Sequence, residues 1–129
     1  METISVKTGG RTDLRNVTEE VERALGRSGV QEGICTVFVA HTTAGVTINE
    51  NADPAVSDDI AATLDRMVPW NGPYRHGEGN SAAHLKASLV GSSVTVPVHG
   101  GRLALGTWQG IFLCEFDGPR TRSIHIQAI

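Results

Sequence analysis

The sequence has no long apolar run and no basic tract. None of its hydrophobic segments approaches the roughly 20 residues of a membrane-spanning helix, and the start METISVKTGGRTD lacks the zones of a signal peptide. Its 11 Lys and Arg are mixed with 14 Asp and Glu, for a net charge of -3, so the phosphate-binding footprint of a nucleic-acid binder is missing. We therefore expect a soluble, cytoplasmic protein with neither a membrane nor a nucleic-acid partner.

Cysteines and aromatic residues are also scarce. The two cysteines, Cys35 and Cys114, lie in apolar strand-like runs, where a reduced cysteine behaves as a small hydrophobe, so no disulfide framework is expected. Aromatic residues make up 5% of the chain, which has 15 glycines; this favours a core of aliphatic strands joined by tight turns. The length of 129 residues fits a single domain over residues 1–129.

Hydrophobic periodicity predicts strands and a helix in the first part of the chain. Residues 2–8 alternate as in a half-buried strand, and residues 18–28 have the spacing of a short helix that stops at Gly29. Residues 33–40 are apolar at nearly every position, which predicts a central strand covered on both faces. Residues 42–49 continue as a second extended segment.

Two further helices are predicted. Asp53 and Pro54 supply the cap and the first position of the clearest helix. Its predicted buried stripe consists of Val56, Ile60, Leu64, Met67 and Val68. After a glycine-rich loop over residues 70–79, a short helix is predicted from Asn80 to Leu89, with Leu85 and Leu89 on its inner face.

Four strand-like runs complete the chain: SSVTVPV, RLALGTW, GIFLCEF and RSIHIQAI. Glycine-containing turns between them favour antiparallel pairing. The predicted class is α+β, a mostly antiparallel sheet or sandwich with helices packed on it. Gly45, within the extended segment, is a candidate for a close backbone approach.

The densest polar stretch runs from His41 to Asp53, directly after the apolar strand. Helix capping explains Asp53. Glu50 and Asn51 lie between the strand end and the cap, where side chains often point into a cleft, and Glu50 is a candidate general base.

Three histidines form the main candidate for a metal site. The segment HGEGNSAAH places His76 and His84 on either side of a loop-to-helix corner, with Glu78, a second candidate for proton transfer, between them. The spacing matches neither HExxH nor a CxxC pair. Convergence with His41 would create a familiar three-imidazole zinc site, but spacing alone does not establish it.

The alternative for each histidine is a hydrogen-bonded structural role. That reading fits His99, in a turn, and His125, on the outward face of a strand. Anion binding has its own candidates. Thr42 and Thr43 offer hydroxyl and backbone donors, and the guanidinium of Arg120 or Arg122, after a tight turn, can bind phosphate in a bidentate manner. The alternative for the two arginines is a solvated strand end.

These residues lie in segments by which the sequence resembles the YjbQ family, also named the secondary thiamine-phosphate synthase enzyme family. The segments are HTTAGVTINENADP, YRHGEGNSAAHLKASLVGSSVTVPV, GRLALGTWQGIFLCEFDGPRTR and NVTEEV. They span nearly the whole chain in the family's order. The resemblance implies a compact α+β domain that assembles as a homotrimer, with sites near subunit contacts. It also implies that His41, His76 and His84 are the characteristic histidines of the family.

The activity that the resemblance implies is thiamine-phosphate synthesis, which joins hydroxymethylpyrimidine pyrophosphate to thiazole phosphate with loss of pyrophosphate, as a secondary reaction. The leading hypothesis is therefore a small trimeric metal-binding enzyme with weak activity of this kind. The alternatives are a non-catalytic binder of a small phosphorylated metabolite and a metal-dependent hydrolase of one. The expected site comprises His41, His76 and His84 for a divalent metal, zinc first and magnesium with a pyrophosphate substrate, Glu50 and Glu78 for proton transfer, and Thr42, Thr43, Asn51 and Arg120 for the substrate anion.

Overall fold

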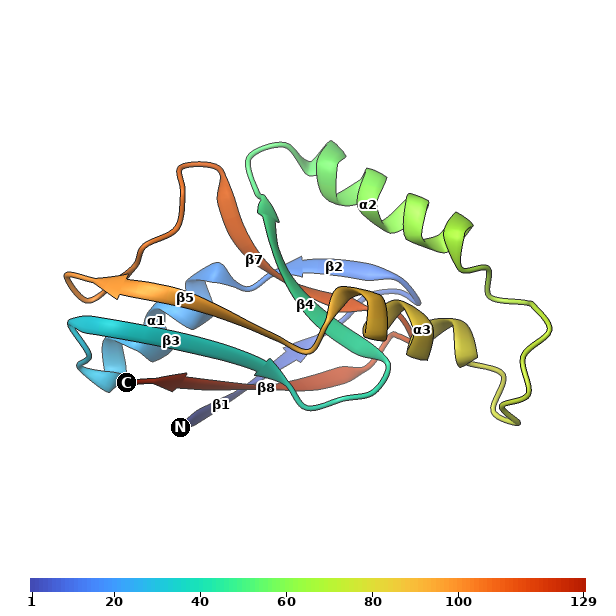
Figure 1. The fold of residues 1–129 in the computed structure, drawn as a ribbon, viewed down its shortest axis with the longest axis horizontal. Coiled ribbons are helices and arrows are strands. Elements are labelled where there is room, and N and C mark those ends of the chain that lie inside the picture. Colours follow the sequence, from blue (N-terminus) through green and yellow to red (C-terminus); the bar gives the residue numbers. More distant parts are fainter.

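The computed structural model describes residues 1–129 as two antiparallel sheets with three helices (Figure 1). In chain order the elements are β1 (Glu2–Lys7), β2 (Asp13–Asn16), α1 (Thr18–Ser28), β3 (Glu32–Val39), β4 (Ala44–Glu50), α2 (Pro54–Met67), α3 (Ser81–Val90), β5 (Ser93–His99), β6 (Arg102–Leu103), β7 (Gln109–Glu115) and β8 (Thr121–Ala128). No helix combines the length and the apolar character needed to cross a membrane.

The larger sheet has the strand order β1-β8-β3-β5-β6, and the smaller has the order β2-β7-β4. Every strand pair is antiparallel. Helix α1 contacts strands of both sheets, whereas α2 and α3 pack on the smaller one. The predicted α+β class is confirmed.

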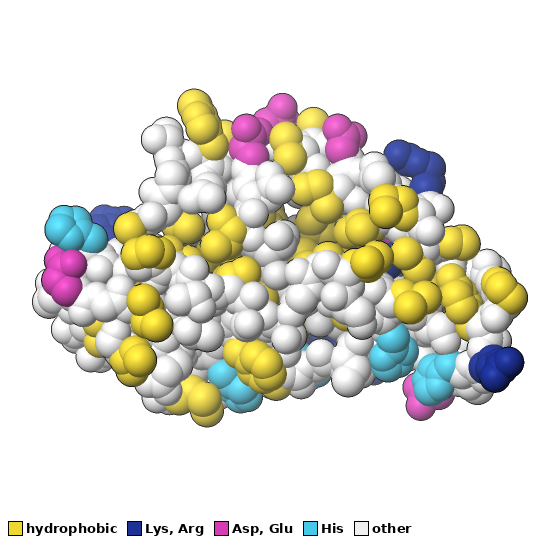
Figure 2. Space-filling model, viewed as in Figure 1, with side chains coloured by type: hydrophobic (Ala, Val, Ile, Leu, Met, Phe, Trp, Pro, Cys, Tyr) yellow, Lys and Arg dark blue, Asp and Glu magenta, His cyan; other side chains and the backbone are white.

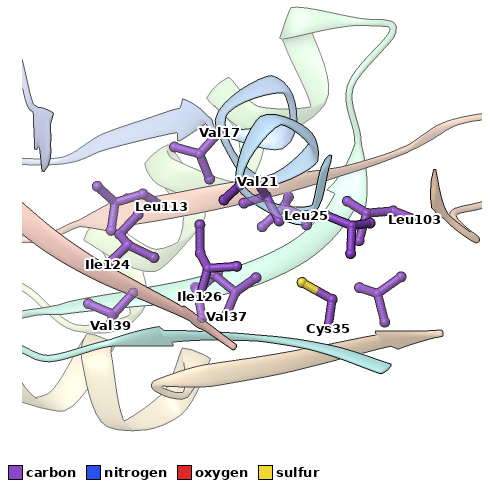
Figure 3. Close-up of a cluster of buried hydrophobic side chains, with 14 of the residues drawn as sticks. Val17, Val21, Leu25, Cys35, Val37, Val39, Leu103, Leu113, Ile124 and Ile126 are labelled. Carbon is purple, nitrogen blue, oxygen red and sulfur yellow. The ribbon is translucent and has the colours of Figure 1, made fainter. Parts of the chain in front are cut away.

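The main core lies between the two sheets and α1 (Figure 3). It is a cluster of 16 buried residues, to which β3 contributes Val37, β8 contributes Ile124, β7 contributes Leu113 and α1 contributes Val21 and Leu25. Burial of each such side chain contributes about 1.5–3 kcal/mol before conformational entropy is counted. The core joins the two sheets and so sets the position of the strand ends around it.

The prediction that β3 is covered on both faces is wrong for the single chain. Val37 and Val39 are buried, but Ile34 and Phe38 on the opposite face are each 42% exposed. Only one face of the larger sheet meets the core, because α1 and the smaller sheet both lie on that side. The outward apolar side chains of β3 therefore lack a cover within the chain.

Helix α2 begins as predicted but is less buried than predicted. Asp53 accepts a hydrogen bond from the Ala55 N–H at 2.9 Å, and Pro54 occupies the first turn. None of the helix residues is fully buried, and Met67 is exposed. The expected stripe is half-buried because the helix rests on the edge strands β2 and β4 instead of a sheet centre.

The predicted inner face of α3 is wrong. Leu85 and Leu89 are exposed, and the residues facing the protein are Ala82, Ala83, Lys86 and Ala87. Small alanines allow the helix to approach β4 and β7, where aromatic side chains such as Phe116 complete a second, smaller core. Figure 2 shows hydrophobic side chains gathered on the surface that carries α2 and α3.

Two strands differ from the prediction, and two glycine predictions are confirmed. Strand β2 was not predicted, and RLALGTW forms a strand only over Arg102–Leu103. A Cβ atom on Gly45 would lie 2.6 Å from the Gly91 carbonyl oxygen, so the backbone approach at Gly45 is as close as expected. Helix α1 also ends as predicted at Gly29, whose φ is 74°.

Candidate functional site

A polar hollow of about 310 Å³ lies where the end of β3, the start of α3 and the turn before β8 meet. Its ten lining residues include none that is hydrophobic. The lining residues are His41, Thr42, Thr43, His76, Glu78, Asn80, His84, Asp117, Arg120 and Arg122. Three chain segments thus bring the three predicted histidines to one place.

His41 is held by the strand next to its own. It follows β3 directly, and its Nε2 accepts a hydrogen bond from the Ser123 N–H of β8 at 2.8 Å. Burial, and after it the positive charge of Arg122, lowers the pKa of His41 below its ordinary value of 6.5. A neutral imidazole that accepts at Nε2 carries its proton on Nδ1, so His41 is a hydrogen-bond donor at neutral pH.

His76 and His84 form the opposite wall, as the segment HGEGNSAAH predicts. Their ring centroids lie 5.3 Å apart, with the rings perpendicular. An oxygen of Glu78, an exposed side chain, lies 4.0 Å from His76 Nε2. A neighbouring hollow of about 500 Å³ is also lined by His41, Thr42 and His84, so these three residues border both hollows.

The three imidazoles do not form a metal-ligand set in this arrangement. No group of three or more His, Cys, Asp or Glu side chains is placed to hold an ion. The Nε2 lone pair of His41 is moreover occupied by the Ser123 N–H. Zinc, or magnesium with a pyrophosphate substrate, therefore stays a prediction that metal analysis can test.

A buried ion pair lies behind the hollow, which its Arg122 side lines. Arg122 and Glu115 are almost completely buried, and the guanidinium donates from Nε to Glu115 Oε1 at 2.8 Å and from Nη2 to Oε2. Nη2 also donates to Thr43 Oγ1 at 2.8 Å, and Thr8 Oγ1 donates to Glu115 Oε1 at 2.7 Å. Thr43, predicted as an anion ligand, thus accepts from Arg122.

The environment of Glu115 favours the charged carboxylate. Burial alone would raise the pKa of Glu115, but the hydrogen bonds from Arg122 and Thr8 outweigh it, so the pKa lies below the ordinary value of 4.5. The sequence reasoning missed this residue. The sequence feature that could have identified Glu115 is a single acid in the apolar run GIFLCEF. Its partner Arg122 lies on the same inward face of β8 as Ile124.

Asp117 organises the rim. It accepts at its carbonyl oxygen from Arg120 Nε (2.8 Å) and at Oδ2 from Arg120 Nη2 (3.0 Å) and Asn80 Nδ2 (2.9 Å). Asn80 was predicted to cap α3, but its side chain makes no cap hydrogen bond, and its Oδ1 is buried without a partner. Arg120 is half exposed, and its Nη1 remains available to a ligand.

Glu50 and Asn51 are not brought to the hollow within one chain. Strand β4 begins after Thr43 and ends at Glu50, and a seven-residue strand spans about 20 Å. The Asn51 N–H donates to the Trp108 carbonyl oxygen at 2.9 Å, at that far end. The two ends of the polar run His41–Asp53 therefore lie in separate regions of the molecule, at opposite ends of β4.

His99 and His125 also lie outside the hollow. His99 Nδ1 is 2.9 Å from a Glu32 carboxylate oxygen on the exposed surface. His125 stacks on Phe38, with ring centroids 6.2 Å apart, and its Nδ1 is 2.8 Å from Thr3 Oγ1. Each thus has a partner that accounts for it structurally.

Known proteins match the chain over nearly its full length. The family described as UPF0047 protein YjbQ-like matches residues 2–129. The chain is 50% identical to YugU of Bacillus subtilis over 98% of this chain and 97% of that protein, and 40% identical to YjbQ of Escherichia coli O157:H7 over 88% and 83%.

Solved structures agree with the sequence relatives. A crystal structure of an uncharacterized YjbQ/UPF0047 family protein from Clostridium acetobutylicum matches with a TM-score of 0.98 and 50% identity, over 100% of both chains. A YbjQ-like protein of unknown function from Sulfolobus solfataricus matches with a TM-score of 0.94 and 36% identity, over 98% of this chain and 94% of that one. The chain therefore belongs to the YjbQ-like UPF0047 family.

Proposed function

We propose that the histidine-lined hollow is the active site of an enzyme that acts on a small phosphorylated metabolite, with thiamine-phosphate synthesis as a secondary activity. The observation that supports this most is the meeting of His41, His76, His84 and Arg120, from separate segments, in a hollow without hydrophobic lining. Structural histidines each need only one partner and have no reason to share a polar hollow. Such a lining suits a small charged ligand better than an apolar one.

Arg120 is the proposed anchor for the phosphate. Two hydrogen bonds to Asp117 fix the guanidinium, and its remaining N–H donors are free for phosphate oxygens. Thr42, exposed on the same rim, and the Nδ1–H of His41 are further donors. The lining holds two arginines and two acids, so the anion is bound by directed hydrogen bonds and not by a strong net positive charge.

The proposed roles of the opposite wall, formed by His76 and His84, are proton transfer and stabilisation of the negative charge that develops in the reaction. In the synthase reaction the thiazole nitrogen attacks the pyrimidine methylene carbon, the bond from that carbon to oxygen breaks, and pyrophosphate leaves with added negative charge. In this proposal His76 and His84 donate hydrogen bonds or a proton to the leaving group, and Glu78, with an oxygen 4.0 Å from His76 Nε2, orients His76. Glu50 has no role here unless a neighbouring subunit supplies it.

A homotrimer is part of the proposal. Ile34 and Phe38 form exposed apolar positions on the outer face of β3, and Leu85 and Leu89 do so on α3. Large apolar side chains exposed on a strand and on a helix suit contacts between subunits. Light scattering tests the assembly: a Phe38→Asp substitution should reduce a trimer to monomers, and a wild-type protein that is already monomeric would refute it.

Turnover assays test the catalytic proposal. Purified protein is assayed for pyrophosphate release from the pyrimidine and thiazole substrates, and for phosphate release from a panel of phosphorylated metabolites. His84→Ala should lower turnover at least about 100-fold, and Arg120→Ala should mainly raise KM. The matched controls His99→Ala and Arg23→Ala remove the same residue types outside the hollow and should have no effect.

The activity and ligand affinity of the two hollow variants distinguish a catalytic site from a binding site. Full activity in both His84→Ala and Arg120→Ala would remove the hollow as the active site. Tight ligand binding without turnover, weakened by the same two substitutions, would identify a non-catalytic binder instead.

A further inference from the structure

Lys86 is a buried charge that does not line the histidine hollow. Its side chain is 2% exposed on the inner face of α3, with Nζ 6.0 Å from the ring centroid of Phe116. Burying an ammonium group is costly unless it is well paired, whereas a leucine or methionine would fill the same space without that cost. Packing of α3 therefore does not account for a lysine at this position.

The pairing of Lys86 within the chain is incomplete. Nζ donates to Asp65 Oδ1, and the same oxygen also accepts from Thr12 Oγ1 at 2.9 Å. The Asp65 side chain is 47% exposed and belongs to α2, which has no buried residue. An ammonium group has three N–H donors, and here one protein oxygen takes one of them.

Lys86 lines a hollow of about 560 Å³ that shares no residue with the histidine hollow. The six lining residues are Arg11, Thr12, Asp65, Trp70, Lys86 and Gly118. Two of these side chains, Arg11 and Lys86, are positively charged and one, Asp65, is negatively charged, so the net charge of the lining is positive. The Arg11 guanidinium lies 4.1 Å from the centroid of the Trp70 ring, which holds it at the rim.

We propose that this second hollow is a binding site for the carboxylate or phosphate group of a small metabolite. Lys86 Nζ and the Arg11 guanidinium donate to the anion, and Asp65 keeps the ammonium in place. The size of the hollow is in the range of small-molecule sites, and Trp70 offers an apolar edge to the rest of the ligand. The site does not depend on the function proposed for the histidine hollow.

Fluorescence of Trp70 provides a direct test. The chain has two tryptophans, and Trp108 is exposed and lines neither hollow, so Trp108→Phe leaves Trp70 as the only reporter. This protein is titrated with inorganic phosphate and, separately, with acetate. A saturable change is expected for at least one anion, and the tighter of the two identifies the preferred group.

Variants in the Trp108→Phe background locate the signal. Arg11→Ala and Lys86→Met should each weaken the affinity at least about tenfold, whereas Arg23→Ala, which removes an exposed positive charge on α1, should leave it unchanged. Circular dichroism shows whether Lys86→Met is folded. If it is unfolded, Arg11→Ala remains a sufficient test, because Arg11 is exposed and its replacement should not disturb the fold. No saturable response to either anion, or an unchanged affinity in Arg11→Ala, would overturn the proposal. So would loss of the response in Arg120→Ala, because the signal would then come from the histidine hollow.

Discussion

The Nε atom of Arg122 lies 2.8 Å from Glu115 Oε1, and both side chains are buried, with Arg122 lining the histidine hollow. Removing one partner of such a pair leaves an uncompensated buried charge. We therefore predict that Glu115→Gln lowers the free energy of unfolding by about 3–5 kcal/mol, measured by urea denaturation.

An exposed pair is the matched control for this prediction. Arg23 and Glu19 form an ion pair on the surface of α1, and Arg23→Ala should cost at most about 1 kcal/mol. Equal costs for the two substitutions would show that the buried pair adds nothing beyond a surface contact.

The same carboxylate predicts a pH dependence of stability. The pKa of Glu115 is lowered in the folded state, so the stability it contributes is fully present above its ordinary value of 4.5 and is lost as the pH falls below that value towards the folded pKa. Urea midpoints between neutral pH and pH about 3 should therefore fall more steeply for the wild type than for Glu115→Gln. Parallel curves would contradict a lowered pKa.

His41 should titrate below the ordinary histidine range. Its folded pKa is lowered from 6.5 by burial and by Arg122, so the unfolded chain binds a proton first, and His41 contributes stability above pH 6.5 that is lost as the pH falls from there to the folded pKa. Histidine NMR spectra against pH test this, with His41→Gln assigning the resonance. The nitrogen shifts should also report the proton on Nδ1; a proton on Nε2 at neutral pH would refute the bond from Ser123.

Metal analysis tests the remaining prediction from the histidines. If His41, His76 and His84 bind zinc, purified protein should contain stoichiometric metal, and His84→Ala should lose it because one of three ligands is gone. His99→Ala should retain it. Protein that is free of metal and cannot be loaded with zinc or magnesium would refute the prediction.

The sequence predicted correctly those features that depend on residues adjacent in the chain. The start of α2 depends on Asp53 and Pro54, adjacent residues that act on the backbone beside them, and it is where the sequence places it. The inner face of α3 was predicted wrongly from Leu85 and Leu89, because a pair of apolar residues marks a face without saying which neighbour covers it. Packing against β4 selected the alanine face instead, and buried Lys86 with it.

The sequence by itself determined the family and the chemical character of the site: imidazoles, acids and arginines in three polar segments. Only the tertiary structure decided which of them meet. His41 joins His76 and His84 because α3 packs beside β4, next to the end of β3. Glu50, nine residues after His41 by number, is carried to the other end of β4 because an extended strand advances about 3.3 Å per residue. Spacing along a chain sets local periodicity, but strand pairing and helix packing set the distances between segments.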